Sequence, residues 1–175
     1  YVTVTAGVVW YGAVNHDLTA VNSSGDTMDL WYHSSGVWTN SGITQYDNTQ
    51  YDDGTDLVSL TGSTYAVNWI FRMVSDEKKM LVVLGNSDYT LGQAQESSVP
   101  TLPEIAITNA ILVGRIIVAK DGSTSTEISS AFETSFAATP ITDHNALSNL
   151  EGGTAGEYNH ATDAEYSDIQ NIPTI

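Results

Sequence analysis

The clearest strand pattern in this chain is Tyr65-Ala66-Val67-Asn68-Trp69-Ile70-Phe71-Arg72-Met73, which is followed by a second apolar run, Met80-Leu81-Val82-Val83-Leu84. In the first run the large side chains alternate with smaller or polar neighbours, and this period of two is typical of a half-buried strand. Residues 75–79, Ser-Asp-Glu-Lys-Lys, form a charged break between the two runs. The two runs are therefore predicted to pair as a hairpin.

The same signals recur on both sides of this hairpin. Met28–His33 and Val37–Thr39 are predicted to pair through the turn Ser34-Ser35-Gly36. Many short strands with Gly, Asn and Asp at their turns predict a mainly β fold, a β-sandwich of jelly-roll type, over residues 1–139. The further predicted strands are Val2–Thr5, Val8–Val14, Ile43–Tyr46, Leu57–Leu60 and Ile111–Val118.

Helical signals are sparse. Thr90–Glu96 is one candidate helix or turn, and Ser125–Phe132 is another, with Thr126 as its N-cap. Both are too short to stand without tertiary support. Pro100 and Pro103 mark a loop that passes between the strand-rich blocks.

Residues 140–175 differ in composition from the rest, because large apolar side chains become rare after Thr139-Pro140. Such a segment cannot form a core alone, since too little apolar burial opposes the loss of chain entropy. Two alternatives remain at this point: a linker without fixed structure, or a segment that packs against copies of itself. The apolar residues available to it are Leu147, Leu150, Tyr158, Tyr166 and Ile169.

Composition excludes several classes of function. The chain has 175 residues and no cysteine, so it has neither disulfides nor thiolate metal sites. No run of eighteen apolar residues is present, so no membrane insertion is expected. The net charge of −16, with only five basic residues, opposes binding to nucleic-acid phosphates. The chain shows no initiating Met and no signal peptide, so a fragment of a longer protein is expected.

A motif in the C-terminal segment carries a resemblance. Residues 143–153 read Asp-His-Asn-Ala-Leu-Ser-Asn-Leu-Glu-Gly-Gly, and residues 157–162 read Glu-Tyr-Asn-His-Ala-Thr. This stretch resembles a motif of tail-fibre and appendage proteins of tailed bacteriophages: His-Asn, two spaced leucines, Gly-Gly, Glu-Tyr, an aromatic residue and His-Leu-Thr. Glu151, Asn159 and Ala161 depart from the family pattern, which has Gln, an aromatic residue and Leu there.

Weaker likeness to the same family extends upstream, through blocks that include Val9-Trp10-Tyr11-Gly12 and Leu112-Val113-Gly114-Arg115. The resemblance implies a virion structural protein, a subunit or fragment of a fibre or appendage that is assembled in the host cytoplasm. It also implies a homotrimer that contacts other virion proteins, with residues 140–175 as the trimerising segment. Leu147, Leu150, Tyr158 and Ile169 are then expected in the shared core, and the turns are shaped by His144, Asn145, Gly152, Gly153, Glu157 and His160.

His144 and His160 are also the candidate metal ligands, because imidazole suits Fe, Zn or Ni and a threefold axis would repeat each one three times. The alternative is that each histidine fixes a turn by bonding to the backbone, and no cofactor is otherwise expected. Asp52-Asp53-Gly54-Thr55-Asp56 superficially resembles a calcium loop, but it lacks the spacing of an EF-hand and is interpreted as a surface turn.

The aromatic residues offer a different hypothesis. Exposed aromatics stack on sugar rings, so a receptor-binding module that recognises host-surface glycan is the alternative function, with Tyr32 and Trp38 as the chosen residues. Core packing is the competing interpretation, and adjacent residues such as Trp31 and Tyr32 cannot both face one side of a sheet. No carboxylate pair stands out by spacing and no Gly-x-Ser-x-Gly elbow is present, so no enzyme is expected; a polysaccharide depolymerase is the remaining third hypothesis.

Overall fold

The computed structural model describes residues 1–133. The chain separates into two units, Tyr1–Thr139 and Pro140–Ile175, and the described residues all belong to the first. The proposed trimerising segment, with its motif and both candidate metal-ligating histidines, lies outside the described residues. Those interpretations stay predictions.

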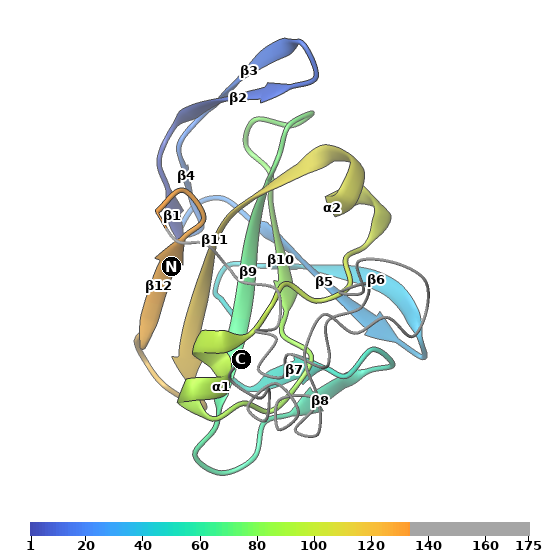
Figure 1. Cartoon of the computed structure of the whole chain (residues 1–175), viewed down its shortest axis with the longest axis vertical. Helices are drawn as coiled ribbons and strands as arrows, with labels where there is room; N and C mark the ends of the chain where they lie inside the picture. Colours follow the sequence, from blue (N-terminus) through green and yellow to red (C-terminus); the bar gives the residue numbers. More distant parts are fainter. Residues whose placement is uncertain (134–175) are drawn as a thin grey trace, which may run out of the picture. The chain divides into compact units, whose positions relative to one another are not determined.

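The centre of the fold is the hairpin that the alternating pattern predicts. Strand β9 (Tyr65–Met73) pairs antiparallel with β10 (Met80–Leu84), with Met80 opposite Arg72 and Leu84 opposite Asn68. On its other side β9 pairs antiparallel with β11 (Ala110–Ala119), and β12 (Glu127–Ser130) extends the sheet beyond β11. Figure 1 shows β9, β10 and β11 side by side. The predicted β9–β10 hairpin is therefore confirmed.

Beyond β10 the sheet continues with the second predicted hairpin. Strand β5 (Met28–Ser34) lies parallel to β10, and β6 (Val37–Ile43) pairs antiparallel with β5 at the edge. The connecting residues Ser35 and Gly36 both have positive φ, 53° and 74°, as the type I′ turn of a two-residue hairpin requires. The six strands therefore follow the order β12-β11-β9-β10-β5-β6.

The remaining described strands form three small antiparallel ribbons. They are β1 (Thr3–Val4) with β4 (Val21–Asn22), β2 (Gly7–Tyr11) with β3 (Val14–Leu18), and β7 (Gln50–Asp52) with β8 (Leu57–Ser59). The described part is thus mainly β, as predicted. The jelly-roll sandwich is not confirmed, because residues 1–133 contain one six-stranded sheet and no second sheet of similar size.

Three finer predictions are wrong. Val8–Val14 is not one strand, because the chain turns at Gly12, whose φ is +63°. In the predicted strand Ile43–Tyr46 only Ile43 belongs to a strand. Ser125–Phe132 is not a helix: the backbone N–H of Thr126 bonds to the carbonyl of Ile117 at 2.8 Å, and β12 follows at once. Pairing with β11 therefore overrides the local N-cap signal.

Two short helices lie between β10 and β11. Helix α1 (Leu91–Glu96) begins at Thr90, whose side chain and that of Gln93 form a capping box, and this helix was predicted. Helix α2 (Glu104–Asn109) follows Pro103 and was not predicted. A proline fits the start of a helix because the N–H that it lacks would have no partner within the helix.

The two faces of the sheet are covered by different parts of the chain. Trp69 and Phe71 of β9 pack beneath the helical segment, against Ala94 of α1 and Ala106 of α2. Ile70 points to the opposite face, where the N-terminal ribbons supply Val2, Val21 and neighbouring side chains. Both faces of β10 are buried, so its run of five apolar residues has no polar alternation.

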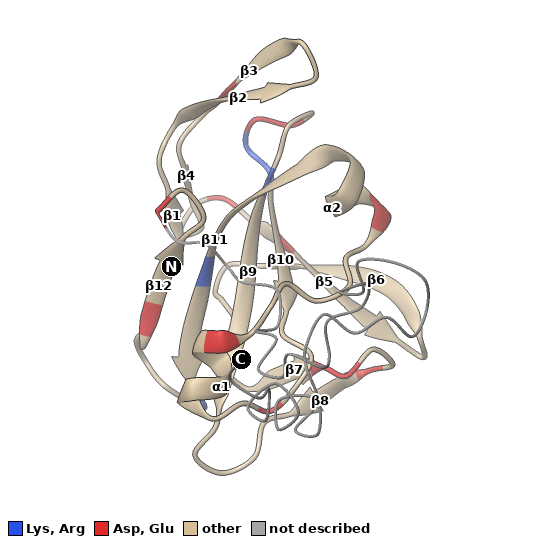
Figure 2. Cartoon of the chain, viewed as in Figure 1, with Lys and Arg blue, Asp and Glu red and all other residues tan. Residues whose placement is uncertain are grey.

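Charge is unevenly distributed over this unit. Figure 2 shows Asp and Glu on loops, on strands and on both short helices, and few Lys or Arg. Two of the basic residues, Arg72 and Arg115, are buried at 1% and 3% exposure. Among the described residues no helix is long and apolar enough to cross a membrane.

Candidate functional site

A cleft of about 290 Å³ opens where four separate segments meet. The β5–β6 hairpin supplies His33 and Trp38, and the β7–β8 turn supplies Asp52, Asp53 and Gly54. The end of β10 and the segment before α2 complete it with Val83, Leu84, Asn86, Pro100 and Thr101. The cleft therefore depends on how these segments are held together.

Asp52 joins the β7–β8 ribbon to the β5–β6 hairpin through hydrogen bonds. It is 5% exposed, and its Oδ2 accepts the backbone N–H of His33 at 3.0 Å and lies 2.9 Å from Nδ1 of the same histidine. Its Oδ1 accepts the N–H of Gly54 at 2.9 Å. Because an ionised carboxylate only accepts, Nδ1–H of His33 is the donor in this contact, and Nε2 has no hydrogen bond within residues 1–133.

The turn of the β5–β6 hairpin is held from outside as well. Asp56 accepts the N–H of Ser35 at 2.8 Å, and the carbonyl of Thr55 accepts the N–H of Gly36 at 2.9 Å. A left-handed conformation is uncommon for a residue with a side chain, so these bonds stabilise Ser35 where it is least favoured. The predicted turn at residues 52–56 therefore also holds the turn of the β5–β6 hairpin by hydrogen bonds.

Within the cleft, Trp38 and His33 are cross-strand partners and their rings touch. The ring centroids are 3.8 Å apart and the planes are tilted by 39°. Both side chains are only partly buried. Val83 and Leu84 of β10 also line the cleft, and both are almost completely buried.

Three polar residues that line the cleft have unused bonding capacity. Asp53 uses Oδ1 to accept the N–H groups of Thr55 and Asp56, at 2.7 and 2.9 Å, and its Oδ2 has no partner in the described part of the chain. These N–H groups hold the pKa of Asp53 below its usual value. Asn86 accepts a bond from the Tyr89 hydroxyl through Oδ1, and its amide nitrogen has no partner among residues 1–133. The Thr101 hydroxyl likewise has no partner within residues 1–133.

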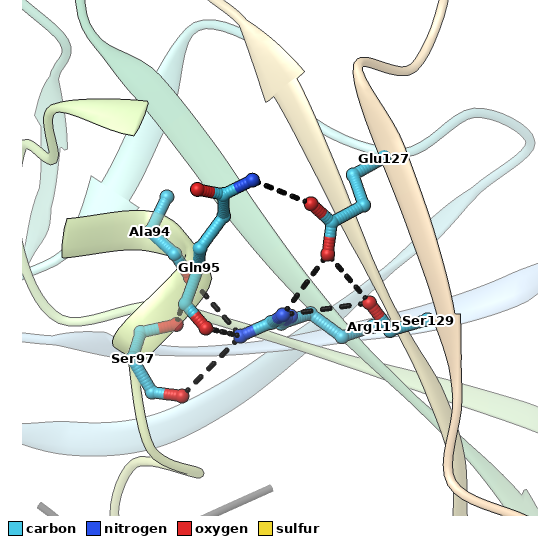
Figure 3. A network of polar contacts seen from close by, with 6 residues as sticks. All are labelled: Ala94, Gln95, Ser97, Arg115, Glu127 and Ser129. Carbon is cyan, nitrogen blue, oxygen red and sulfur yellow. Dashed lines mark hydrogen bonds and ion pairs between the residues drawn. The ribbon is translucent and has the colours of Figure 1, made fainter. Parts of the chain in front are cut away.

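Arg115 of β11 holds α1 and the segment that leads from it to the cleft. Figure 3 shows its guanidinium beside the end of α1, where Nη1 donates to the carbonyls of Ala94 at 3.0 Å and Gln95 at 2.8 Å. A contact of 3.5 Å to the carbonyl of Ser97 continues toward Pro100. A cation at a helix C-terminus complements the negative end of its dipole.

The other side of the same guanidinium faces β12. Nη2 lies 3.3 Å from Oε1 of Glu127 and 3.4 Å from the Ser129 hydroxyl, which itself donates to Glu127 at 2.8 Å. Bonds from Gln95 and Ser129, and then the charge of Arg115, lower the pKa of Glu127. One buried cation thus connects α1, β11 and β12.

The chemistry available in the cleft is that of binding. Aliphatic and aromatic surface lies beside a few polar groups, which is the usual composition of a small-molecule site. Neither oxygen of Asp52 is unused, so its carboxylate is already committed to structure. Among residues 1–133, no three side chains of His, Asp or Glu are grouped so as to hold a metal ion.

The structure separates the two aromatic residues chosen from the sequence. Trp38 lines the cleft. Tyr32 packs against the cluster of Val2, Met28 and their neighbours, on the opposite face of the sheet from Trp38. Trp31 and Tyr32 indeed face opposite sides, as strand alternation predicts.

Sequence reasoning missed most of the cleft. His33 had a usable signal, because counting outward from the two-residue turn places it directly opposite Trp38. Asp52, Asn86 and Thr101 had none, since they come from segments that meet only in the folded chain.

Comparison of the chain with family models, with curated proteins and with solved structures finds no match.

Proposed function

We propose that this chain is a subunit, or a fragment of a subunit, of a trimeric tail fibre or appendage of a tailed bacteriophage. The observation that carries the proposal is the pattern His144-Asn145, Leu147, Leu150, Gly152-Gly153 and Glu157-Tyr158. Residues 1–139 would form a β head, and residues 140–175 would join three copies, through Leu147, Leu150, Tyr158 and Ile169. It would act as a structural part of the virion and not as an enzyme.

The composition of the second unit supports this division. Residues 140–175 contain six acidic residues and no Lys or Arg, with few large apolar side chains. A segment of this kind gains a core only if several chains contribute to it. Trimerisation also repeats any binding site on the head three times, which raises avidity without new contacts.

Light scattering tests the proposal directly. The full chain is expected at three times 18.8 kDa, and a chain that ends at Pro140 is expected as a monomer. A full-length variant with Leu147→Asp and Leu150→Asp should also be monomeric, with the head still folded by circular dichroism. Trp10→Ala, an exposed change on the head, is the matched control and should leave the trimer intact. A monomeric full chain overturns the proposal for this piece.

The cleft favours a second function, recognition of host-surface glycan. The specific observation is that Trp38 lines a cavity together with free polar atoms of Asp53 and Asn86. Titration of the chain with saccharides from the host envelope, followed by tryptophan fluorescence, tests this function. Trp38→Ala should remove the response, and a response that persists in this variant places binding elsewhere.

A further inference from the structure

We infer that the cleft takes a saccharide that carries no acidic group, as one or two pyranose rings, and that it rejects uronic acids, sialic acids and phosphorylated sugars. This inference rests on the proposed glycan recognition and specifies the ligand class.

The charged side chains that line the cleft disfavour an acidic ligand. Two carboxylates, Asp52 and Asp53, belong to the lining, and no Lys or Arg does. The chain has five basic residues in all, and Arg72 and Arg115 are buried away from the cleft with their own carbonyl partners. An anionic ligand would therefore approach two carboxylates with no Lys or Arg in the lining to pair with.

The polar groups of the lining residues suit the hydroxyls of a sugar. The residues that line the cleft carry an acceptor at Asp53 Oδ2, a donor at the Asn86 amide, a hydroxyl at Thr101 and the Nε2 atom of His33, none of which has a hydrogen bond within residues 1–133. Hydroxyls both donate and accept, so neighbouring hydroxyls of one sugar ring can bond to such a mixed set. A ligand with acceptors alone, such as phosphate, would leave Asp53 without a donor.

The exposed part of the Trp38 indole offers a surface on which a sugar ring can pack. The C–H groups of a pyranose ring carry a small positive charge, and the face of an aromatic ring is negative. His33 covers part of Trp38, since the centroids are 3.8 Å apart, so a sugar can use only the rest of the indole together with the partly buried Pro100.

Size limits the ligand. The cavity of about 290 Å³ lies just below the usual range for small-molecule sites, which begins at about 300 Å³. It suits one ring or two, with a longer chain extending into solvent.

Matched sugar pairs give the sharpest experiment on the full chain. Glucose with glucuronic acid, and galactose with galacturonic acid, differ only in a hydroxymethyl group against a carboxylate. Mannose, rhamnose and N-acetylglucosamine complete the neutral set, and sialic acid completes the acidic set. Binding is followed by NMR shifts of the Trp38 indole N–H and of the Asn86 and Thr101 amides.

At least one neutral sugar is expected to bind, and its acidic counterpart should bind about tenfold more weakly or not at all. Asp53→Asn keeps the Oδ1 acceptor for the turn but removes the charge, so it should narrow the difference within each pair. Trp38→Ala should abolish binding, whereas Trp10→Ala, another tryptophan outside the cleft, should not change it.

The outcomes separate the two levels of the proposal. If a sugar and its acidic counterpart bind equally, the inferred ligand class is wrong and glycan recognition stands. If no neutral sugar shifts the cleft signals, the inference is overturned, and binding of an acidic sugar alone would still support glycan recognition. If no sugar of either kind binds, both fail. The light-scattering result for the trimer is independent of each outcome.

Discussion

The hairpins β5–β6 and β2–β3 are similar in local structure and differ in how they are held. The β5–β6 hairpin pairs with β10 along one edge, and Asp52, Thr55 and Asp56 bond to its turn. Within residues 1–133, a single hydrogen bond joins residues 7–17 of the β2–β3 hairpin to another element, from the Tyr11 hydroxyl to the Thr108 carbonyl at 2.5 Å. An isolated two-stranded hairpin is marginally stable in water, so docking determines which of the two is rigid.

Burial follows the same division. Met28 and Leu30 of β5 are 0% and 5% exposed, whereas Val8 and Trp10 of β2 are 61% and 71% exposed. The docked hairpin can therefore hold a binding site in fixed geometry, and the β2–β3 hairpin cannot do so alone.

The largest effect is expected from Arg115→Met, which breaks the polar network that joins α1, β11 and β12. The change removes the donor for the carbonyls at the end of α1 and leaves Glu127 without its cation. The free energy of unfolding should fall by about 2–4 kcal/mol, measured by urea denaturation. Lys78→Met removes an exposed cation and should stay within about 0.5 kcal/mol of the native chain. Equal effects of the two variants would mean that the buried network contributes nothing.

Asp52→Ala tests the link between the two docked turns. It removes the acceptor of three hydrogen bonds, two from His33 and one from Gly54, so a loss of about 1–3 kcal/mol is expected. NMR should show shifted amides at His33 and Gly54 and unchanged amides in β2 and β3. Asp17→Ala on β3 is the matched control. Amide shifts that change equally in both hairpins would contradict the expectation that Asp52 holds β5–β6 and not β2–β3.

Tyr11→Phe acts on the β2–β3 hairpin, and its effect is expected to stay within that hairpin. Loss of the bond to Thr108 should make amide exchange in β2 and β3 about two- to tenfold faster, with global stability nearly unchanged. Tyr32→Phe removes a hydroxyl that has no hydrogen bond in the described part of the chain and should alter neither quantity. Unchanged exchange in Tyr11→Phe would show that the hairpin is held by something else.

The smallest effect concerns acid and the β7–β8 turn. The folded pKa of Asp53 is lowered, so its contribution is complete above the unfolded value of about 3.9 and is lost as pH falls through the lower, folded value. The side-chain carboxyl carbon of Asp53 and the amide of Thr55 should keep their NMR shifts from pH 7 to about 5 and change below about 4. A midpoint above that value would contradict the lowered pKa.

Local patterns predicted local structure well. The β9–β10 hairpin follows from alternation and a charged turn, and the β5–β6 hairpin follows from Ser35-Gly36. The parallel pairing of β5 with β10 has no such signal, because no turn joins the two strands. The local pattern makes Ser125–Phe132 a candidate helix or turn with Thr126 as its N-cap, but residues 127–130 pair with β11, which a local pattern does not reveal.

The cleft was predictable only in part, for the same reason. Trp38 was chosen from its chemistry, and hairpin register could have added His33. Asp52, Asn86 and Thr101 reach the cleft through long-range pairing and through the position of α1, which Arg115 fixes from a different strand.

The parallel pairing of β5 with β10 also affects how the chain is made. Synthesis delivers β5 and β6 well before β10, so β5 leaves the ribosome with one edge unpaired and with Met28 and Leu30 uncovered. An open edge can accept any suitable strand, including β10 of another copy made nearby. Folding of this domain therefore competes with strand exchange between nascent chains until residue 84 has emerged.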